Sequence, residues 1–148
     1  MTKFWQSDGT LPHLITIQFY KRQSVAEVAL FLDHAADDSY TPQRLSIKSG
    51  PGLRHDLREV KAVNLPEEEG RVTGWVRIPL HAPSKRGVQR FLLTDSLQVS
   101  FSYMFANGRD LHVRCIHVLG PERGVQPLLE RMTPRWVSPE MYVGAAVR

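Results

Sequence analysis

The chain has 148 residues, 42% of them apolar, which suffices for one domain with a single core and hardly for two. Its 19 Lys and Arg residues against 15 Asp and Glu leave a formal charge of +4 without a block of like charges, which argues against nucleic-acid binding. The single cysteine, Cys115, excludes an intramolecular disulfide, and no stretch approaches the roughly 20 apolar residues of a membrane span. We therefore expect a soluble protein of a reducing, intracellular compartment.

Short segments rich in β-branched and aromatic residues follow one another along the chain and predict strands. The first, Leu14–Tyr20, alternates apolar and polar residues as a half-buried strand does. The second, Val25–Leu32, also fits the spacing of a helix, and we predict a strand. The other predicted strands cover Arg44–Lys48, Asp56–Val63, Val72–Ile78, Leu97–Phe105 and His112–Leu119. Their spacing predicts an all-β sandwich or barrel.

Two further features complete the predicted organisation. Trp75, in the strand Val72–Ile78, is expected to be largely buried between the sheets. After Pro121 the strand pattern stops and prolines interrupt the chain. We therefore predict a domain over residues 1–121 and an irregular C-terminal tail over residues 122–148.

A search for catalytic or metal-binding patterns favours a protein without either. The six histidines, at positions 13, 34, 55, 81, 112 and 117, lack the spacing of a metal-binding pair. Ser7 lies near Asp8 and His13, but no G-x-S-x-G turn surrounds the serine. A hydrolase using Ser7 and His13 remains a minor alternative, and we predict a non-enzymatic chain with no cofactor and no metal.

Polar residues gather where two predicted loops meet strands. The segment Asn107–Arg114 surrounds a turn, and we expect Asn107 and His112 to point outward from the loop end. Arg114 is expected to pair with a carboxylate such as Asp110. In the second cluster, Asp38–Pro42, Tyr40 is either a core anchor or a contact residue.

Six blocks of the sequence, taken in order, resemble the DOC domain family. They are Trp5-Gln-Ser-Asp-Gly9 with Pro12-His13 and Ile17-Gln18-Phe19; Asp38-Ser-Tyr-Thr-Pro42; Ile47; His55-Asp-Leu57; Gly74-Trp-Val76 with Ile78-Pro-Leu80; and Asn107-Gly-Arg-Asp110 with His112-Val-Arg114. The resemblance extends from Phe4 to about Pro121. It implies a galactose-binding-like jelly roll, which agrees with the predicted strands.

The resemblance also implies a function in mitotic protein degradation. Domains of this family act without catalysis in the anaphase-promoting complex, a ubiquitin ligase, where they support substrate recognition and processivity. With a WD40 coactivator they form the receptor for destruction-box substrates. By resemblance the degron-binding residues are Asn107, Gly108, Arg109, Asp110 and His112, with Ser7, Asp8, Asp38, Ser39 and Tyr40 as neighbours.

The last two residues, Val147 and Arg148, resemble the tail by which the family docks to a tetratricopeptide-repeat subunit. The ligase scaffold is the other expected partner; no nucleic acid or membrane is expected. The implied location is the nucleus and cytoplasm.

The sequence departs from the family pattern in two places, and one other function class remains open. The family's sandwich begins a few dozen residues before the block at Trp5, so we expect either that the first strands are missing from this sequence or that its sheets close differently. Met104-Phe105-Ala106 replaces polar residues that precede the Asn107 turn in the family. The alternative function is a DOC-type or carbohydrate-binding module outside this complex, with Trp75 or Tyr40 stacking on a sugar.

Overall fold

The computed structural model describes residues 3–51, 56–65, 72–80, 91–121 and 146–147. Within these residues the chain forms ten strands and three short helical segments. The strands are β1 (Trp5–Gln6), β2 (His13–Val25), β3 (Glu27–Asp33), β4 (Pro42–Gly50), β5 (Arg58–Asn64), β6 (Thr73–Pro79), β7 (Leu92–Met104), β8 (His112–Val113), β9 (Cys115–Leu119) and β10 (Ala146–Val147). The helical segments are α1 (His34–Asp37), η1 (Asp38–Tyr40) and η2 (Phe105–Asn107).

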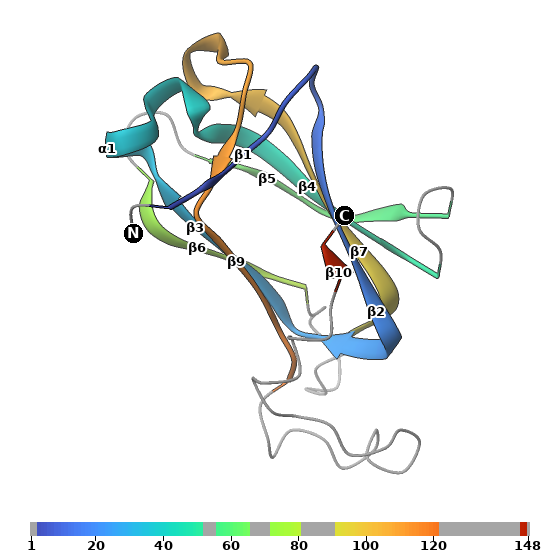
Figure 1. Cartoon of the computed structure of the whole chain (residues 1–148). Helices are drawn as coiled ribbons and strands as arrows, with labels where there is room; N and C mark the ends of the chain where they lie inside the picture. The colour runs from blue at the N-terminus through green and yellow to red at the C-terminus, as the bar shows by residue number, and fades with distance from the viewer. Residues whose placement is uncertain (1–2, 52–55, 66–71, 81–90, 122–145, 148) are drawn as a thin grey trace.

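Two antiparallel sheets form the body of the molecule (Figure 1). One sheet has the order β10-β2-β7-β4-β5 and the other the order β6-β3-β9. The short strands β1 and β8 pair with each other, with Trp5 opposite Val113 and Gln6 opposite His112. The order of strands along the chain thus differs from their order in the sheets, as expected of a jelly roll rather than a meander.

The core lies between the two sheets because alternate residues of each strand point inward. The inward residues of the larger sheet include Ile15, Ile17, Leu45, Ile47, Leu97, Val99 and Phe101, and those of the smaller sheet include Val28, Leu30, Leu32, Ile78 and Val118. Burying each such side chain contributes about 1.5–3 kcal/mol, so this layer supplies most of the driving force for folding.

The predicted all-β sandwich is confirmed, and each predicted strand overlaps an observed one. The segment that also fitted a helix is strand β3. The predicted last strand, His112–Leu119, is divided at Arg114 into β8 and β9. The sequence did not predict the short strands β1 and β10, the first part of β7 (Leu92–Ser96) or the last part of β2 after Tyr20.

The expectation that Trp75 is buried between the sheets is wrong. Its side chain is 43% exposed, on the outer face of the smaller sheet opposite Phe31. The inward face of β6 carries Val76 and Ile78 instead, and Ile78 is fully buried. Trp75 packs edge-on against Phe31, with ring centroids 5.4 Å apart, and its ring lies 4.5 Å from that of His117.

The C-terminal tail contributes one element to the sandwich. Ala146 and Val147 form β10, which pairs antiparallel with Gln18 and Ile17 of β2 and becomes the outer strand of the larger sheet. Residues 122–145 and Arg148 of the predicted tail lie outside the described residues, as do His55 and His81.

Candidate functional site

Three loops from distant parts of the sequence meet at one end of the sandwich, the upper end in Figure 1. They are the Ser7–Asp8 turn, the Asp37–Tyr40 segment and the Asn107–Leu111 turn, here called the loop end. Ser7 connects the first to the third. Its backbone N–H donates to the carbonyl of Leu111 at 2.9 Å, and the Leu111 N–H donates to the Ser7 hydroxyl at 2.8 Å. This buried pair fixes the turns to each other.

The second and third loops touch through their backbones. A Cβ atom on Gly108 would lie 1.8 Å from the carbonyl oxygen of Ser39, so only glycine permits this approach. The Phe105 N–H also donates to the carbonyl of Thr41 at 2.9 Å. The two predicted clusters around Asp38 and Asn107 therefore form one surface.

The residues predicted to bind a degron differ in exposure within this surface. Asp8, Asp38, Tyr40, Asn107 and Arg109 are exposed. Ser39, Gly108 and Asp110 are half-buried, whereas Ser7 and His112 are buried. The predicted residues are thus brought together, but only part of the set can reach a ligand directly.

Beneath the surface lies a charge cluster of Asp37, His112 and Arg114. Arg114 donates from Nη2 to Asp37 Oδ1 at 2.6 Å and from Nε to Asp37 Oδ2 at 2.9 Å. His112 donates from Nδ1 to Asp37 Oδ1 at 3.1 Å. A carboxylate of Asp33 lies 3.9 Å from Arg114 Nε. The cluster joins the α1 region to the strands β8 and β9.

The cluster has a definite electrostatic effect on its members. Burial by itself raises the pKa of Asp37, but the hydrogen bonds and charges of Arg114 and His112 outweigh it and hold the pKa below its ordinary value. The hydrogen bond to Asp37 raises the pKa of Arg114. Asp37 is thus an ionised carboxylate at neutral pH, as a bidentate arginine pair requires.

An aromatic stack of Phe4, His112 and Tyr40 stands on this cluster. The His112 ring lies 3.9 Å from the Phe4 ring and 4.2 Å from the Tyr40 ring, at interplanar angles of 22° and 10°. An imidazole has only two faces, so these two rings cover both. The Arg114 guanidinium lies 5.6 Å from the Phe4 ring, within cation–π range.

Two expectations about this region are wrong. His112 does not point outward; it is only 9% exposed, because the two rings and Asp37 enclose it. Arg114 pairs with Asp37 and not with Asp110. The departure at Met104-Phe105-Ala106 is largely internal, since Met104 and Phe105 join the core and only Ala106 is exposed.

Two contributors to the site were missed in the sequence, Asp37 and Phe4. Asp37 adjoins the predicted Asp38 cluster, and the need of Arg114 for a carboxylate was the signal that could have found it. Phe4 gave no signal beyond being an apolar residue beside the Trp5 block.

The hydrolase alternative finds no support in the positions of Ser7 and His13. The Ser7 hydroxyl accepts from the Leu111 amide, and His13 Nε2 donates to the carbonyl of Arg109 at 2.5 Å. Both side chains are buried, and their hydrogen bonds hold the loops together. Among the described residues, no group of three or more His, Cys, Asp and Glu residues is arranged to hold a metal ion. No helix in the described part of the chain is long and apolar enough to cross a membrane.

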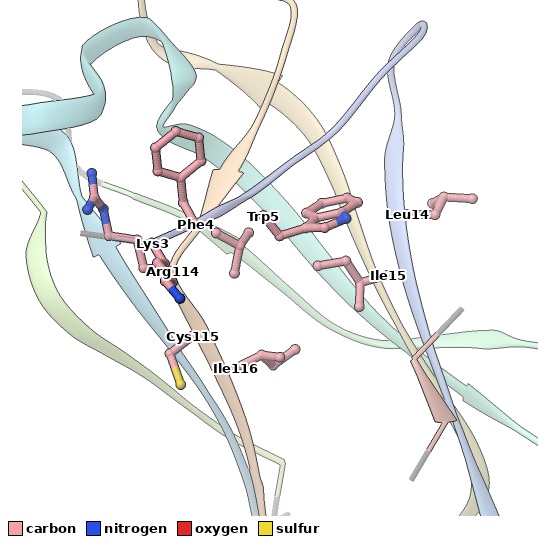
Figure 2. Close-up of a pocket in the computed structure, with 9 residues that line it drawn as sticks. Lys3, Phe4, Trp5, Leu14, Ile15, Arg114, Cys115 and Ile116 are labelled. Atoms are coloured by element: carbon pink, nitrogen blue, oxygen red, sulfur yellow. The ribbon is translucent and has the colours of Figure 1, made fainter. Parts of the chain in front are cut away.

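A pocket of about 380 Å³ opens on the flank of the sandwich next to the stack (Figure 2). This flank pocket is lined by Lys3, Phe4, Trp5, Leu14, Ile15, Val113, Arg114, Cys115 and Ile116. Trp5 and Leu14 line it and remain 46% and 45% exposed. It lies between β2 and β9, at the side where β10 pairs with β2 further along. Phe4 and Arg114 thus belong both to this pocket and to the contacts beneath the loop end.

The fold places the chain among galactose-binding-like jelly-roll domains. The CBM32-3 module of a family 31 glycoside hydrolase from Clostridium perfringens superposes with a TM-score of 0.60 at 16% identity, covering 80% of this chain and 75% of that one. A second Clostridium perfringens module, CpGH89CBM32-5, solved in complex with GalNAc-β-1,3-galactose, gives 0.58 at 8% identity, covering 78% and 73%. At these identities the likeness concerns the fold alone.

Sequence comparison then identifies the family. The family described as "Anaphase-promoting complex, subunit 10" matches residues 1–143, and the chain belongs to it. Anaphase-promoting complex subunit 10 of Drosophila melanogaster is 39% identical over 130 residues, 88% of this chain and 62% of the relative. The Dictyostelium discoideum subunit 10 is 37% identical over 145 residues, 98% of this chain and 71% of the relative. The resemblance to the DOC domain family is thereby confirmed. The chain spans about three fifths of the length of the Drosophila relative.

Proposed function

We propose that this chain is a non-catalytic substrate-recognition and processivity subunit of the anaphase-promoting complex, acting in the nucleus and cytoplasm. In this proposal the loop end forms a destruction-box receptor together with a WD40 coactivator. Family membership supports the assignment to the complex. The observation that carries the site is the meeting of three sequence-distant loops, joined by the Ser7–Leu111 hydrogen bonds and the Gly108–Ser39 approach.

The chemistry of the loop end suits a short extended peptide. Arg109 offers a guanidinium, Asp8 and Asp38 offer carboxylates, Asn107 offers an amide and Tyr40 offers an aromatic face, all of them exposed. Such a mixed set recognises backbone amides and charged side chains of a bound segment. The hydrogen bonds of Ser7 and His13 hold these loops in place, so less conformational entropy is lost on binding.

The decisive experiment measures processivity in a reconstituted ligase containing Asn107→Gly with Arg109→Ala. Asn107 has a positive φ of 56°, which glycine also adopts, so the side chain is removed without backbone strain. The Arg109 carbonyl still accepts from His13 in this variant. Stability should change by only about 0.5 kcal/mol per substitution. Fewer ubiquitins should be added per encounter with a substrate carrying one destruction box.

The matched control uses the same residue types on a strand away from the loop end. Arg58 and Asn64 are exposed on β5, and Arg58→Ala with Asn64→Ala should leave processivity at the wild-type level. Equal processivity in the test variant, the control and the wild type would place the degron contacts elsewhere.

The partners of the tail form the second part of the proposal. Val147 and Arg148 would dock to a tetratricopeptide-repeat subunit, and the body of the domain would lie against the ligase scaffold. Val147→Ala with Arg148→Ala should weaken co-purification with that subunit while the melting temperature stays unchanged, because a short terminal segment contributes little to a core. Undiminished co-purification would contradict the proposed docking of the tail, but it would not affect the proposal for the loop end.

A second candidate function, carbohydrate binding outside this complex, has one observation in its favour. Trp75 is 43% exposed beside Phe31 and His117, and an exposed tryptophan can stack on a sugar ring. A glycan array probed with wild type and Trp75→Ala tests it. Binding that disappears in the variant would support this function, and a blank array for both proteins would reject it.

A further inference from the structure

His112 was expected to touch the degron, but its contacts suit a different role. Its Nδ1 atom donates to Asp37, whose two carboxylate oxygens are held by Arg114. Its backbone is paired opposite Gln6 in the β1–β8 ladder. The ring is therefore fixed in both position and orientation before any ligand arrives.

The exposed neighbour of this fixed ring is Tyr40. The Tyr40 ring lies 4.2 Å from the His112 ring and within 10° of parallel to it, while 38% of the Tyr40 residue remains exposed. Phe4 stacks on His112 at 3.9 Å, so the imidazole is held between the two rings. A chain of contacts thus runs from Arg114 through Asp37 and His112 to Tyr40 at the surface.

We propose that His112 is a positioning residue, which fixes the ring of Tyr40 as a rigid contact for the degron. This inference rests on the proposed function of the loop end. An aromatic ring already held in its bound orientation loses little conformational freedom on binding, which strengthens and sharpens recognition. His112 acts on Tyr40 through the packing of its ring, which Phe4 supports from the opposite face, and the bond to Asp37 adds to the stability of the fold.

Two substitutions separate the ring from the hydrogen bond. His112→Phe retains an aromatic ring between Phe4 and Tyr40 but cannot donate to Asp37. His112→Asn can donate to Asp37 but offers no ring to Tyr40. Degron recognition should depend on the presence of the ring. His112→Phe should therefore keep most of the processivity, whereas His112→Asn should lose about as much processivity as Tyr40→Ala. Both variants should lower the melting temperature, because His112→Phe loses the hydrogen bond and His112→Asn loses the packing of the ring on its two faces.

A double-mutant cycle tests the coupling to Tyr40. His112→Asn combined with Tyr40→Ala should be no worse than Tyr40→Ala by itself, because contacting residues are energetically coupled. His112→Asn combined with Arg109→Ala should multiply the two separate losses, since the Arg109 side chain lies outside the stack. The ring protons of Tyr40, followed by NMR in the folded chain, should move downfield in His112→Asn and stay upfield in His112→Phe.

The outcomes distinguish this inference from the proposed function. Additive losses for His112→Asn and Tyr40→Ala, or an equal loss of processivity in His112→Phe and His112→Asn, would overturn the positioning role. Wild-type processivity in Tyr40→Ala would also overturn it. If Tyr40→Ala has wild-type processivity but the Asn107→Gly, Arg109→Ala variant is impaired, the proposed function still holds. If both variants have wild-type processivity, the proposed function also fails.

Discussion

Phe4 and Arg114 lie both beneath the loop end and in the lining of the flank pocket, but the two regions differ in how firmly their other side chains are held. Beneath the loop end, His112 and Arg114 are bonded to Asp37, and Tyr40 is stacked on the fixed ring of His112. In the flank pocket, Trp5 and Leu14 stand about half exposed over a mainly apolar lining. The two regions thus differ in how firmly their side chains are held in place.

The difference lies in preorganisation. Ser7, Asp37 and Arg114 are hydrogen-bonded within the protein, so binding at the loop end need not reorganise these three residues. The flank pocket is bordered mainly by apolar side chains, with Lys3 and Arg114 as its charged members, so the affinity of a ligand there would come largely from burial of apolar surface. Substitutions should therefore have their largest effects on stability beneath the loop end, and smaller effects in the flank pocket.

The largest effect is expected for Asp37→Asn, which removes the shared carboxylate of the charge cluster. Breaking a buried pair leaves Arg114 without its main counter-charge and should lower the free energy of unfolding by ~3–5 kcal/mol at neutral pH. The control is Asp95→Asn, which breaks the exposed Arg22–Asp95 pair and should cost far less, because solvent screens the two charges. Urea denaturation of the three proteins measures both values. Equal losses in the two variants would contradict the contrast between buried and exposed pairs.

The pH dependence of this effect has a definite sign. The pKa of Asp37 is lowered from its ordinary value of 3.8, so its contribution to stability is fully present above that pH. It is lost as the pH falls through the lower folded-state pKa. The difference in unfolding free energy between wild type and Asp37→Asn should therefore shrink below about pH 3.8. A difference that stays constant down to strongly acidic pH would show that the carboxylate charge is not responsible.

A smaller effect is expected for Gly108→Ala, which forces the second and third loops apart. The new Cβ would meet the Ser39 backbone, so the variant should lose ~1–3 kcal/mol and some processivity. Gly9→Ala is the control, since Gly9 has a positive φ of 96° and no atom within 4 Å of a built Cβ. That variant should lose only the conformational term of about 1–2 kcal/mol, without moving the other two loops. Normal processivity in Gly108→Ala would show that the loop contact is dispensable.

The half-exposed tryptophans should give intermediate losses. Trp5→Ala in the flank pocket and Trp75→Ala on the smaller sheet should each cost about 1–2 kcal/mol, well below a fully buried tryptophan. Trp5→Ala should leave processivity unchanged, which separates the flank pocket from degron recognition. Thermal unfolding and the processivity assay measure both. Impaired recognition in Trp5→Ala would extend the site onto the flank.

The smallest effect should be a gain. Ala106 is exposed and has a positive φ of 51°, a conformation that costs an alanine about 1 kcal/mol relative to glycine. Ala106→Gly should raise the free energy of unfolding by up to about 1 kcal/mol, reduced by the greater freedom of glycine in the unfolded chain. Chemical denaturation measures the gain. A loss of stability would mean that the unfolded-state term is the larger one.

Local patterns predicted the sandwich well because strand alternation is a local property. The alternation in β2 and the turn residues between strands sufficed for that prediction. The same alternation in β6, with Val76 and Ile78 on one face and Trp75 and Arg77 on the other, correctly opposed burial of the tryptophan. The expected burial rested on the size of the tryptophan side chain, which the alternation of the strand overrides.

The candidate site was predictable only in part, because its contacts join residues far apart in the sequence. The loops around Asn107 and Asp38 were identifiable from turn chemistry and from the family resemblance. The partner of Arg114 was not, since Asp110 is the nearest carboxylate in sequence and Asp37 the one that the fold brings within 2.6 Å. Burial of His112 depends likewise on Phe4 and Tyr40 arriving from two other segments.

Strand β2 and the proposed tetratricopeptide-repeat partner would compete for the same C-terminal residues, because β10 pairs with β2. Backbone groups of Val147 pair opposite Ile17, so a tail held in the sheet must leave it before an external groove can take the same residues. Because the competing strand belongs to the same molecule, its local concentration does not fall on dilution. The affinity measured for the tetratricopeptide-repeat subunit would then be the intrinsic affinity multiplied by the fraction of molecules with a released tail. A free peptide ending in Val-Arg should consequently bind that subunit more tightly than the whole chain does.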